Sequence, residues 1–546
     1  MSSSSSVSPQ EFEVIKKCIV KVAKGCAVVA ACFYGSRVAG YARPDSDIDV
    51  LVVLENYPYV VKYVYFSESG VKLSALAVDR AALERDAKNA FLGEFVVGRL
   101  LHIYEPITNA DFFAQVEQAY KRRVILEEVQ DIVCLTGVLG TEIIFPLEYV
   151  VFSKIRRRMS LYPSAAYSYY KTYASSNERN LEFALGGYRR ALADIVSEDR
   201  ELFAARQDGL LQVSGKRVFV EGGQTRLKLT KRLQEFSSYF VHTYAGRKIM
   251  HLAVSEAESK IRRHHTGKDV EMPYFMACPK GAYWTLPEGR LIVGSRDWLG
   301  DLGYSVARKK RLGNVNSRTV LYMLEDGRKV VVKELAKSKA VKWAALSLWT
   351  APVKRFRVDP LFRLGSEYKA IRYIRSLGLR TPAIEAVVLD RKILVTQFIE
   401  GRTLASVIKD YIRGRGDDIA LIGKAGAQIA RIHSAGSTLG NVKPKNVIAS
   451  SGSGDQYFTD VEQFMFQAGD PAWDLAQFIS WGLKGTSNSS MAAKITREFL
   501  KGYVDIAGYG NVARLAKSRR YIESFYPVLA PSVARAIKKE IKEIAK

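Results

Sequence analysis

Cysteine and histidine, the residues that most often bind zinc, are scarce in this chain. The 546 residues contain five cysteines and six histidines. The cysteines are odd in number and none falls in a C-x-x-C spacing. The adjacent His264 and His265 lie in KIRRHHTGK, which is typical of a solvated basic helix end. We therefore expect neither a zinc site nor a disulfide framework.

Long apolar runs are missing as well. The longest candidate for a membrane span, VCLTGVLGTEIIFPLEYVVF, is interrupted by Glu142 and Glu148, whereas a spanning helix needs about 20 apolar residues. The chain begins with MSSSSSVSPQ, which has serines where a secretory signal has a basic stretch and then an apolar one. We expect a soluble, cytoplasmic protein with no membrane partner, and residues 1–9 as a disordered tail.

Acidic residues are few relative to basic ones. Lysine and arginine total 82 against 56 aspartates and glutamates, which gives a formal net charge of +26. Such an excess creates a positive surface potential that attracts polyanions. Nucleic acid is the partner that this charge predicts, and the alternative is that the charge only keeps the protein soluble.

The order of apolar patterns predicts a multidomain protein of α/β and α+β class. A chain of this length exceeds what one hydrophobic core organises. Helix-like and strand-like segments first alternate, the chain then turns helical, and a hairpin followed by helices fills the last part. The predicted divisions are an α/β domain at 10–120, a helical, winged-helix-like basic domain at 121–225, an unresolved connector at 226–304 and an α+β domain at 305–546.

Two turns support these divisions. DGLLQVSGKRVFVEGG reads as two short strands around Ser214 and Gly215, which is the reason for a winged-helix-like prediction. TVLYMLEDGRKVVVKEL reads as two strands joined by Asp326 and Gly327, and an Asp-Gly pair between apolar runs is a strong hairpin signal.

The middle of the chain mixes cations with tyrosines. Arginine and lysine can hold phosphates while tyrosine rings stack on bases, so this mixture predicts an RNA-binding surface. The alternative is that the tyrosines are core anchors and the arginines form a solvated face. The candidate cations are Lys154, Arg156, Arg157, Arg158, Lys171, Arg226, Lys228, Lys231 and Arg232, beside Tyr162, Tyr167, Tyr169, Tyr170 and Tyr173.

A first constellation lies in GSRVAGYARPDSDIDV. Asp47 and Asp49 are two residues apart in a strand, so their side chains share one face. Two neighbouring carboxylates repel each other unless a divalent cation binds both, and Mg²⁺ is the expected ion. Gly35 allows close approach of a triphosphate, and the Ser36 hydroxyl can bind its oxygens.

This pattern resembles the DNA polymerase beta-like nucleotidyltransferase superfamily, in which an apolar residue and Gly-Ser precede Asp-x-Asp. The resemblance implies a nucleotidyltransferase fold and a third carboxylate on a later strand, for which Asp79 at the end of VKLSALAVD is the candidate. Asp79 has an alternative role, because it can cap the helix RAALERDA that follows it. Without a third carboxylate, the domain would bind without catalysing.

A second constellation begins at Lys333, which ends the apolar run VVVKEL and can reach the α- and β-phosphates of a nucleotide. Glu367 in SEYKAIRYIRSLG is its candidate partner. The segment VTQFIEG, which contains Glu400, reads as a strand and turn between two lobes where adenine could bond the backbone. The loop before the hairpin, RLGNVNS, offers Gly313 as its one glycine.

Further on, LGNVKPKNVI and FTDVEQ resemble the protein-kinase-like superfamily, whose loop is H-x-D-x-K-P-x-N. The resemblance implies a bilobal kinase-like domain that uses ATP and Mg²⁺, with Asn446 and Asp460 on the metal, Lys443 on the γ-phosphate and Asp474 bracing the loop. The residues at the corresponding loop positions of this chain are Leu439, Asn441, Lys443, Pro444 and Asn446. Leu439 replaces the histidine of the superfamily.

Asn441 stands where the superfamily has its catalytic aspartate, and an amide cannot accept a proton as a carboxylate does. The chain is then a nucleotide-binding pseudokinase, or carries an inactivating substitution, or activates a substrate hydroxyl in another way. The kinase of the KEOPS tRNA-modification complex and the archaeal kinases of a tRNA ribose 2′-hydroxyl are similar in these motifs, which implies a tRNA partner.

Several functions follow from the two constellations. The leading hypothesis is an ATP- and Mg²⁺-dependent RNA kinase that phosphorylates a tRNA ribose hydroxyl, with the nucleotidyltransferase fold and basic middle binding the RNA. A second is a nucleotidyltransferase that uses Asp47, Asp49 and Asp79, with a regulatory pseudokinase half. The others are a nucleotide-gated RNA-binding scaffold and an atypical protein kinase.

Overall fold

The structure is a computed structural model. It describes residues 9–68, 70–161, 166–173, 178–204, 206–214, 283–312, 318–335 and 359–546.

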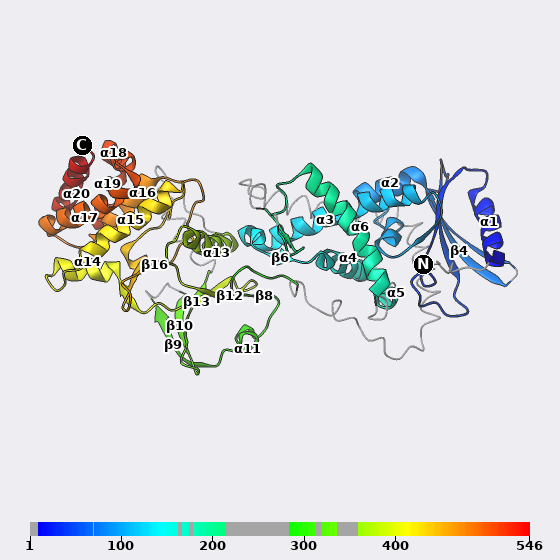
Figure 1. The fold of residues 1–546 in the computed structure, drawn as a ribbon, viewed down its shortest axis with the longest axis horizontal. Helices are drawn as coiled ribbons and strands as arrows, with labels where there is room; N and C mark the ends of the chain where they lie inside the picture. The colour runs from blue at the N-terminus through cyan, green and yellow to red at the C-terminus, as the bar shows by residue number, and fades with distance from the viewer. Residues whose placement is uncertain are drawn as a thin grey trace. The chain divides into compact units, whose positions relative to one another are not determined.

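The chain divides into two compact units. The first unit comprises Met1–Leu135 and Ile144–Trp284, and the second comprises Thr136–Ile143 and Thr285–Lys546. Each unit combines an open sheet with helices (Figure 1). The predicted fold class, α/β and α+β multidomain, is confirmed. None of the described helices is long and apolar enough to cross a membrane.

The first unit is built on a sheet with strand order β3-β4-β2-β1-β5. Strands β2 and β4 run parallel, and the other neighbours are antiparallel. The elements are α1 (Pro9–Ala23), β1 (Val28–Tyr34), β2 (Ile48–Leu54), β3 (Val61–Glu68), β4 (Val71–Asp79), α2 (Arg80–Asn89), η1 (Val97–Leu101) and β5 (Glu105–Thr108).

Alternation along these strands gives the sheet two different faces. Ile48, Val50 and Val52 of β2 pack with Ile15 and Ile19 of α1 in one core, because side chains two apart share a face. Asp49 therefore lies on the opposite face. Figure 1 shows α1 and α2 on either side of this sheet.

Helices make up the rest of the first unit. They are α3 (Ala110–Thr136), α4 (Leu147–Leu161), α5 (Ala166–Thr172) and α6 (Glu178–Glu198), with short strands β6 (Ile144–Phe145) and β7 (Leu211–Gln212). β7 pairs with β6. The strand predicted after Ser214 lies outside the described residues, so the winged-helix-like hairpin stays a prediction.

The sheet of the second unit has strand order β8-β12-β13-β11-β10-β9. The predicted hairpin is confirmed: β10 and β11 are antiparallel neighbours, and Gly327 in their turn has φ +83°. The strands are β8 (Arg290–Ile292), β9 (Val306–Leu312), β10 (Thr319–Leu324), β11 (Lys329–Glu334), β12 (Ile384–Val388) and β13 (Ile393–Gln397). Helix α11 (Trp298–Leu302) also belongs to this unit, although it falls in the stretch predicted as a connector.

Helix α13 (Pro360–Ser376) lies in sequence between β11 and β12. Asp359 caps it by accepting from the Phe362 amide, and Pro360 occupies its first turn, both of which favour a helix start. A one-turn segment from elsewhere in the sequence, η2 (Gly137–Thr141), packs against α13. A Cβ at Gly365 would collide with the backbone of Leu139, so only glycine allows this close approach.

The remainder of the second unit is a mostly helical lobe, shown in yellow to red in Figure 1. Helices α15 (Ala420–Ser434) and α17 (Ser489–Ala507) approach so closely that a Cβ at Gly426 would collide with the Phe499 carbonyl oxygen. The elements are β14 (Gly401–Thr403), α14 (Leu404–Ile412), α15 (Ala420–Ser434), η4 (Pro444–Asn446), β15 (Val447–Ser450), β16 (Gln456–Phe458), α16 (Pro471–Gly482), α17 (Ser489–Ala507), α18 (Gly510–Lys517), α19 (Arg520–Glu523), η5 (Tyr526–Val528) and α20 (Pro531–Ile544).

Candidate functional site

The structure brings the predicted pair Lys333 and Glu367 together. Lys333 ends an apolar strand, β11, and is 8% exposed. Glu367 is on a buried face of α13. The Nζ of Lys333 donates to Oε1 of Glu367 at 2.9 Å. The pair therefore links the sheet to α13.

The two predicted metal ligands also join this cluster. Asp460 follows β16 with φ +56°, and its Oδ1 accepts from Lys333 Nζ at 2.5 Å. Asn446, in the η4 turn, donates from Nδ2 to the other carboxylate oxygen of Asp460 at 3.3 Å. An amide oxygen and a carboxylate are ligands that Mg²⁺ accepts. These side chains therefore fit a Mg²⁺ site beside the lysine.

Sequence reasoning missed two members of this cluster. Glu462, two residues after Asp460, lies 3.2 Å from Lys333 Nζ and accepts from Arg363 at 2.7 Å. Arg363 and Glu462 are both buried. The available signal was the spacing of Arg363 and Glu367, four residues apart and so on one side of a helix. Nothing in the sequence alone showed that Glu462 is buried.

The cluster carries more negative than positive charge. Lys333 and Arg363 are cations, whereas Glu367, Asp460 and Glu462 are carboxylates, so these five groups sum formally to −1. Burial opposes the charged form of Lys333, but its three carboxylate neighbours outweigh burial and raise the pKa of its ammonium. Burial raises the pKa of Glu367 to about 7, against the effect of Lys333. A divalent cation would offset this excess charge.

Asn441 lies next to the cluster and is 5% exposed. Its backbone carbonyl accepts from Asn446 Nδ2 at 3.3 Å. Its side-chain Oδ1 is buried and makes no hydrogen bond with the described residues. Asn441, Asn446 and Asp460 line a common pocket with Leu439 and Thr459. An unpaired buried oxygen is costly, which fits a group that bonds a ligand in this pocket.

Asp474 braces the loop as the kinase resemblance implies. Its carboxylate accepts from the amides of Leu439 at 2.7 Å and Gly440 at 2.9 Å. It also contacts Nε2 of His433 at 3.2 Å. The other ring nitrogen of His433 is 2.9 Å from the Tyr503 hydroxyl. These buried hydrogen bonds fix the backbone on the N-terminal side of Asn441. Of the residues that make them, the sequence indicated only Asp474.

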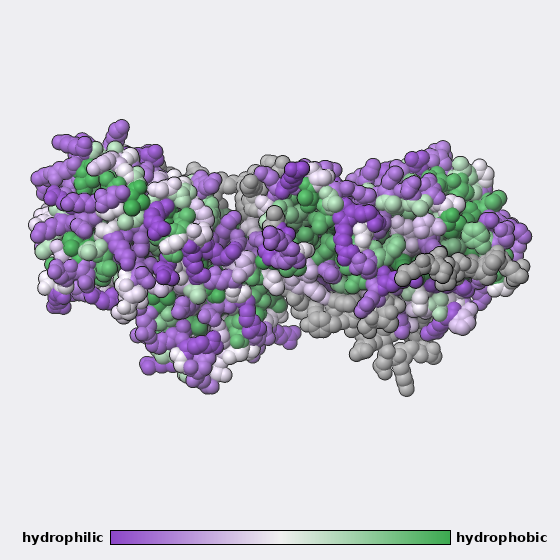
Figure 2. Space-filling model, in the orientation of Figure 1, coloured by the Kyte–Doolittle hydropathy of each residue, from purple (hydrophilic) through white to green (hydrophobic). Residues whose placement is uncertain are grey.

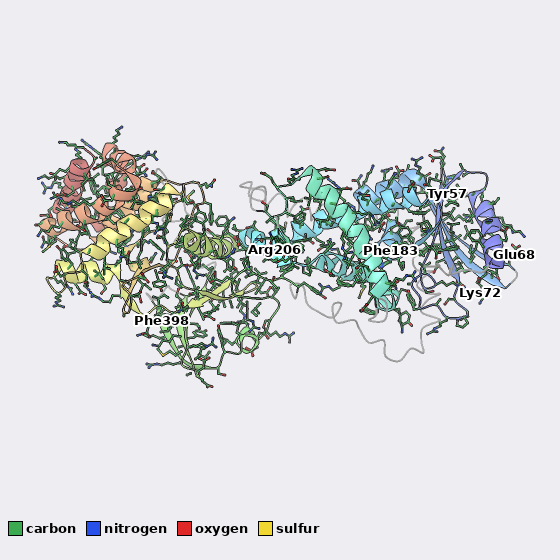
Figure 3. All side chains as sticks on the ribbon, in the orientation of Figure 1. Tyr57, Glu68, Lys72, Phe183, Arg206 and Phe398 are labelled. Atoms are coloured by element: carbon green, nitrogen blue, oxygen red, sulfur yellow. The ribbon has the colours of Figure 1, made fainter. Side chains whose placement is uncertain are left out.

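Two other residues predicted to contact the nucleotide, Lys443 and Glu400, contact side chains outside the Lys333 cluster. Lys443 lies with Nζ 4.8 Å from the centre of the Trp481 ring. Glu400 is exposed and pairs with Lys329. It belongs to the segment between β13 and β14, where Figure 3 labels Phe398, whose amide donates to the Lys329 carbonyl at 3.2 Å. Gly313 lies outside the described residues.

In the first unit, Asp49 and Gly35 are adjacent. Asp49 on β2 pairs with Tyr34, the residue before Gly35. Gly35 has φ +82°, and a Cβ there would collide with Oδ2 of Asp49. Asp47 precedes β2, and both carboxylates are half-buried. Ser36 lies in the following turn, where its carbonyl accepts from the Tyr41 amide.

The structure does not bring Asp79 to these carboxylates. Ser74 is the residue of β4 opposite Asp49, whereas Asp79 is opposite Leu54, five residues or about 17 Å further along the strand. Asp79 caps α2, accepting from the Ala82 amide at 3.1 Å and from the Tyr57 amide (labelled in Figure 3) at 2.9 Å. The alternative role as a helix cap is the one observed.

No third carboxylate replaces it. Across the described ranges, no group of three or more His, Cys, Asp or Glu side chains is placed to hold a metal ion. Asp47 and Asp49 are therefore the carboxylates that the first unit offers to Mg²⁺.

Burial corrects part of the predicted RNA-binding surface. Lys154 and Arg158 are each 3% exposed. Lys154 donates to Glu94 at 2.6 Å, and Arg158 donates to Tyr169 at 3.1 Å and to the Glu94 carbonyl at 2.9 Å. Buried cations need paired carboxylates, so these two hold α4 in the unit and are not available to RNA.

The remaining predicted cations are less enclosed or not described. Arg157 is half-buried and pairs with Glu128 and Asp131. Arg156 and Lys171 are half-buried. Tyr169 and Tyr173 are core residues, as the alternative interpretation expected. Arg226, Lys228, Lys231, Arg232 and Tyr162 lie outside the described residues.

Comparison with known proteins identifies the first domain. Residues 15–132 match the family model described as a nucleotidyltransferase domain, which supports the nucleotidyltransferase domain predicted in this part of the chain, whereas its bounds of 10–120 stay a prediction. No curated protein matches the sequence.

The solved structures that are similar to this chain include two at low identity. One is "Amicoumacin kinase hAmiN in complex with AMP-PNP, Ca2+ and Ami", with 11% identity and a TM-score of 0.28 over 44% of this chain and 90% of that one. The other is "the bifunctional kinase- methyltransferase WbdD", with 12% identity and a TM-score of 0.23 over 43% and 47%. The kinase-like interpretation rests on the cluster around Lys333. With the domain match, it indicates a transferase that binds nucleotides.

Proposed function

We propose that the second unit binds ATP with Mg²⁺ and transfers the γ-phosphoryl group to a hydroxyl of RNA, with tRNA as the substrate to test first. The observation that carries this proposal is the contact of Lys333 with Glu367 and Asp460, with Asn446 beside Asp460. Phosphoryl transfer depends mainly on positioning and charge stabilisation, and this cluster supplies both.

Each residue has a separate task in this proposal. Glu367 orients Lys333, whose ammonium binds the α- and β-phosphates. Asp460 and Asn446 would hold Mg²⁺, which neutralises charge on the phosphates when bound. Asp474 keeps the loop amides in place. In the transfer, the acceptor oxygen bonds to the γ-phosphorus, the bond from that phosphorus to the bridging oxygen breaks, and ADP leaves.

Asn441 decides the rate of this step. The acceptor hydroxyl must lose its proton, and the amide of Asn441 cannot take it. A positioned base contributes about 10²- to 10⁴-fold, so the natural chain transfers slowly, with the proton passing to water or to a phosphate oxygen. An aspartate in the same buried position would supply the base.

RNA is favoured as acceptor by charge. The chain carries a formal net charge of +26, and neutralisation of phosphates by lysine and arginine supplies most non-specific affinity for nucleic acid.

The test uses γ-labelled ATP and tRNA with the full chain, Asn441→Asp and the double variant Asn441→Asp with Lys333→Met. We expect Asn441→Asp to label tRNA at least about 100-fold faster than the natural chain, and the double variant to lose this gain. If Asn441→Asp binds ATP and tRNA but transfers no label, the kinase proposal is wrong. The chain is then a nucleotide-gated RNA-binding scaffold.

A second candidate function is nucleotidyl transfer in the first unit, which would have to proceed on Asp47 and Asp49 alone, because no third carboxylate joins them among the described residues. The family match and the position of Asp49 against Gly35 favour it. α-labelled nucleoside triphosphates test it directly. Incorporation that Asp47→Ala abolishes and Asn441→Asp leaves unchanged would support this activity, whereas no incorporation into any RNA acceptor would exclude it.

A further inference from the structure

Strand β9 forms one end of the sheet in the second unit and carries a run of cations. It pairs with β10 alone in the described sheet. Its sequence is VARKKRL, and Arg308, Lys309, Lys310 and Arg311 are all exposed. Figure 2 shows mainly hydrophilic residues around the position that β9 occupies in Figure 1.

Cations on or next to the neighbouring strands β10 and β11 have carboxylate partners, whereas those of β9 have none among the described residues. Arg318 pairs with Glu334, Arg328 with Asp326, and Lys329 with Glu400. Within the described residues, no ion pair involves the four β9 cations. Lys309 lies over the ring of Tyr322, 4.7 Å from its centre. Among the described residues, the excess positive charge of this strand is therefore not neutralised by carboxylates.

The strand register divides these cations between two faces. Arg308 is opposite Met323 and Lys310 is opposite Leu321. Met323 and Leu321 share a face with Thr319, which pairs with Lys333, because side chains two apart point the same way. Arg308 and Lys310 are therefore on the sheet face of Lys333.

Lys309 and Arg311 are on the opposite face. Lys309 is opposite Tyr322, which packs with Trp298 of α11 and with Val330 and Val332 in the core of this sheet. With about 4.8 Å between strands and about 3.3 Å per residue, the backbones of Lys310 and Lys333 are about 12 Å apart. The cations on the Lys333 face therefore place positive charge at the sheet edge, on the same face as the nucleotide site.

We propose that the face of β9 formed by Arg308 and Lys310 binds the phosphate backbone of the RNA acceptor. This inference rests on the proposed function and assigns its acceptor a docking surface. Nucleic acid fits better than a membrane surface, because membrane binding is strengthened by apolar groups beside the cations, and the only apolar residues of β9 besides Ala307 are the half-buried Val306 and Leu312.

The face assignment supplies its own matched control. The first double variant is Arg308→Ser with Lys310→Ser, and the second is Lys309→Ser with Arg311→Ser. Both remove the same charge from the same exposed strand. Binding of tRNA by the full chain is measured by fluorescence anisotropy at several salt concentrations, and Mg²⁺-dependent ATP binding is measured in parallel.

We expect the first variant to lose about tenfold or more in tRNA affinity at low salt. Its plot of log affinity against log salt should be shallower by about 1.4, the value for two contacts to single-stranded phosphates. The second variant should lose about threefold or less. Both should bind ATP as the natural chain does, which shows that the sheet is folded.

Three other outcomes overturn the inference. Equal losses in the two variants would remove the face assignment, and an unchanged affinity in the first would remove the surface. Tight binding to vesicles rich in phosphatidylserine, with no tRNA binding, would replace RNA by a membrane. If the first variant loses tRNA but Asn441→Asp transfers no label, the docking surface stands and the kinase proposal fails.

Discussion

At the scale of single residues, the proposed kinase activity depends on the difference between an amide and a carboxylate at position 441. The other groups of the site are in contact: Lys333 with Glu367 and Asp460, and Asp460 with Asn446. The Oδ1 of Asn441 is buried without a partner among the described residues. Position 441 therefore lines the pocket with a side-chain oxygen that is not used by the described residues.

Glu367 gives the second unit a pH dependence. Burial raises its pKa to about 7, above the value of an unfolded glutamate, so the folded protein holds this proton more tightly. This contribution to stability is fully present below the unfolded pKa and is lost as the pH rises through about 7. Urea unfolding from pH 5 to 8 should show a steeper fall in the free energy of unfolding for the natural chain than for Glu367→Gln.

An exposed glutamate provides the comparison for this measurement. Glu325 is exposed in the turn of the β10-β11 hairpin, so Glu325→Gln should leave the slope unchanged. Identical slopes for the natural chain and Glu367→Gln would contradict the raised pKa.

Substitutions of Asp79 and Asp49 test which carboxylate of the first unit binds Mg²⁺ with a nucleotide and which only stabilises the fold. Asp79→Ala removes a helix cap and should lower the free energy of unfolding by about 1 kcal/mol, with little change in Mg²⁺-dependent binding of nucleoside triphosphates. Asp49→Ala should weaken that binding and spare stability. Calorimetry with both variants measures the two effects. Loss of nucleotide binding in Asp79→Ala at unchanged stability would reverse the assignment.

At the scale of elements, the sequence predicted the strands, turns and loops that are marked by residues close together in the sequence. The Asp326-Gly327 hairpin, the strand that bears Asp49 and the loop from Leu439 to Asn446 all have characteristic residues at fixed spacing. Burial is not local. Lys154 and Arg158 read as exposed cations, but α4 turns them toward Glu94. Glu462 and the packing of η2 on α13 also depend on residues far apart in the sequence.

A single substitution can test the contact between η2 and α13. Gly365→Ala places a methyl group against the backbone of Leu139, and overpacking of this kind costs about 1–3 kcal/mol. Because Gly365 is two residues before Glu367, ATP affinity should fall as well. Gly510→Ala is the control, since a Cβ at that first residue of α18 meets nothing within 4 Å. A Gly365→Ala variant as stable as the natural chain would contradict the close approach.

At the scale of the whole molecule, the chain carries two candidate nucleotide sites of different composition. The first unit offers Asp47 and Asp49 on a sheet with a nucleotidyltransferase family match. The second surrounds Lys333 with carboxylates and presents the cations of β9 at the end of the same sheet. The net charge of +26 suits an acceptor that is a polyanion. Nucleotide binding to either unit must therefore be separated from binding to the other.

The most direct test is calorimetric titration of ATP, with and without Mg²⁺, into the full chain carrying Asp47→Asn and Asp49→Asn to remove the metal ligands of the first unit. We predict that Mg²⁺-dependent ATP binding remains. Adding Asp460→Asn should weaken it by about tenfold or more, equivalent to about 1.4 kcal/mol. ATP binding that is absent in the first variant, or unchanged by Asp460→Asn, would contradict a nucleotide site around Lys333.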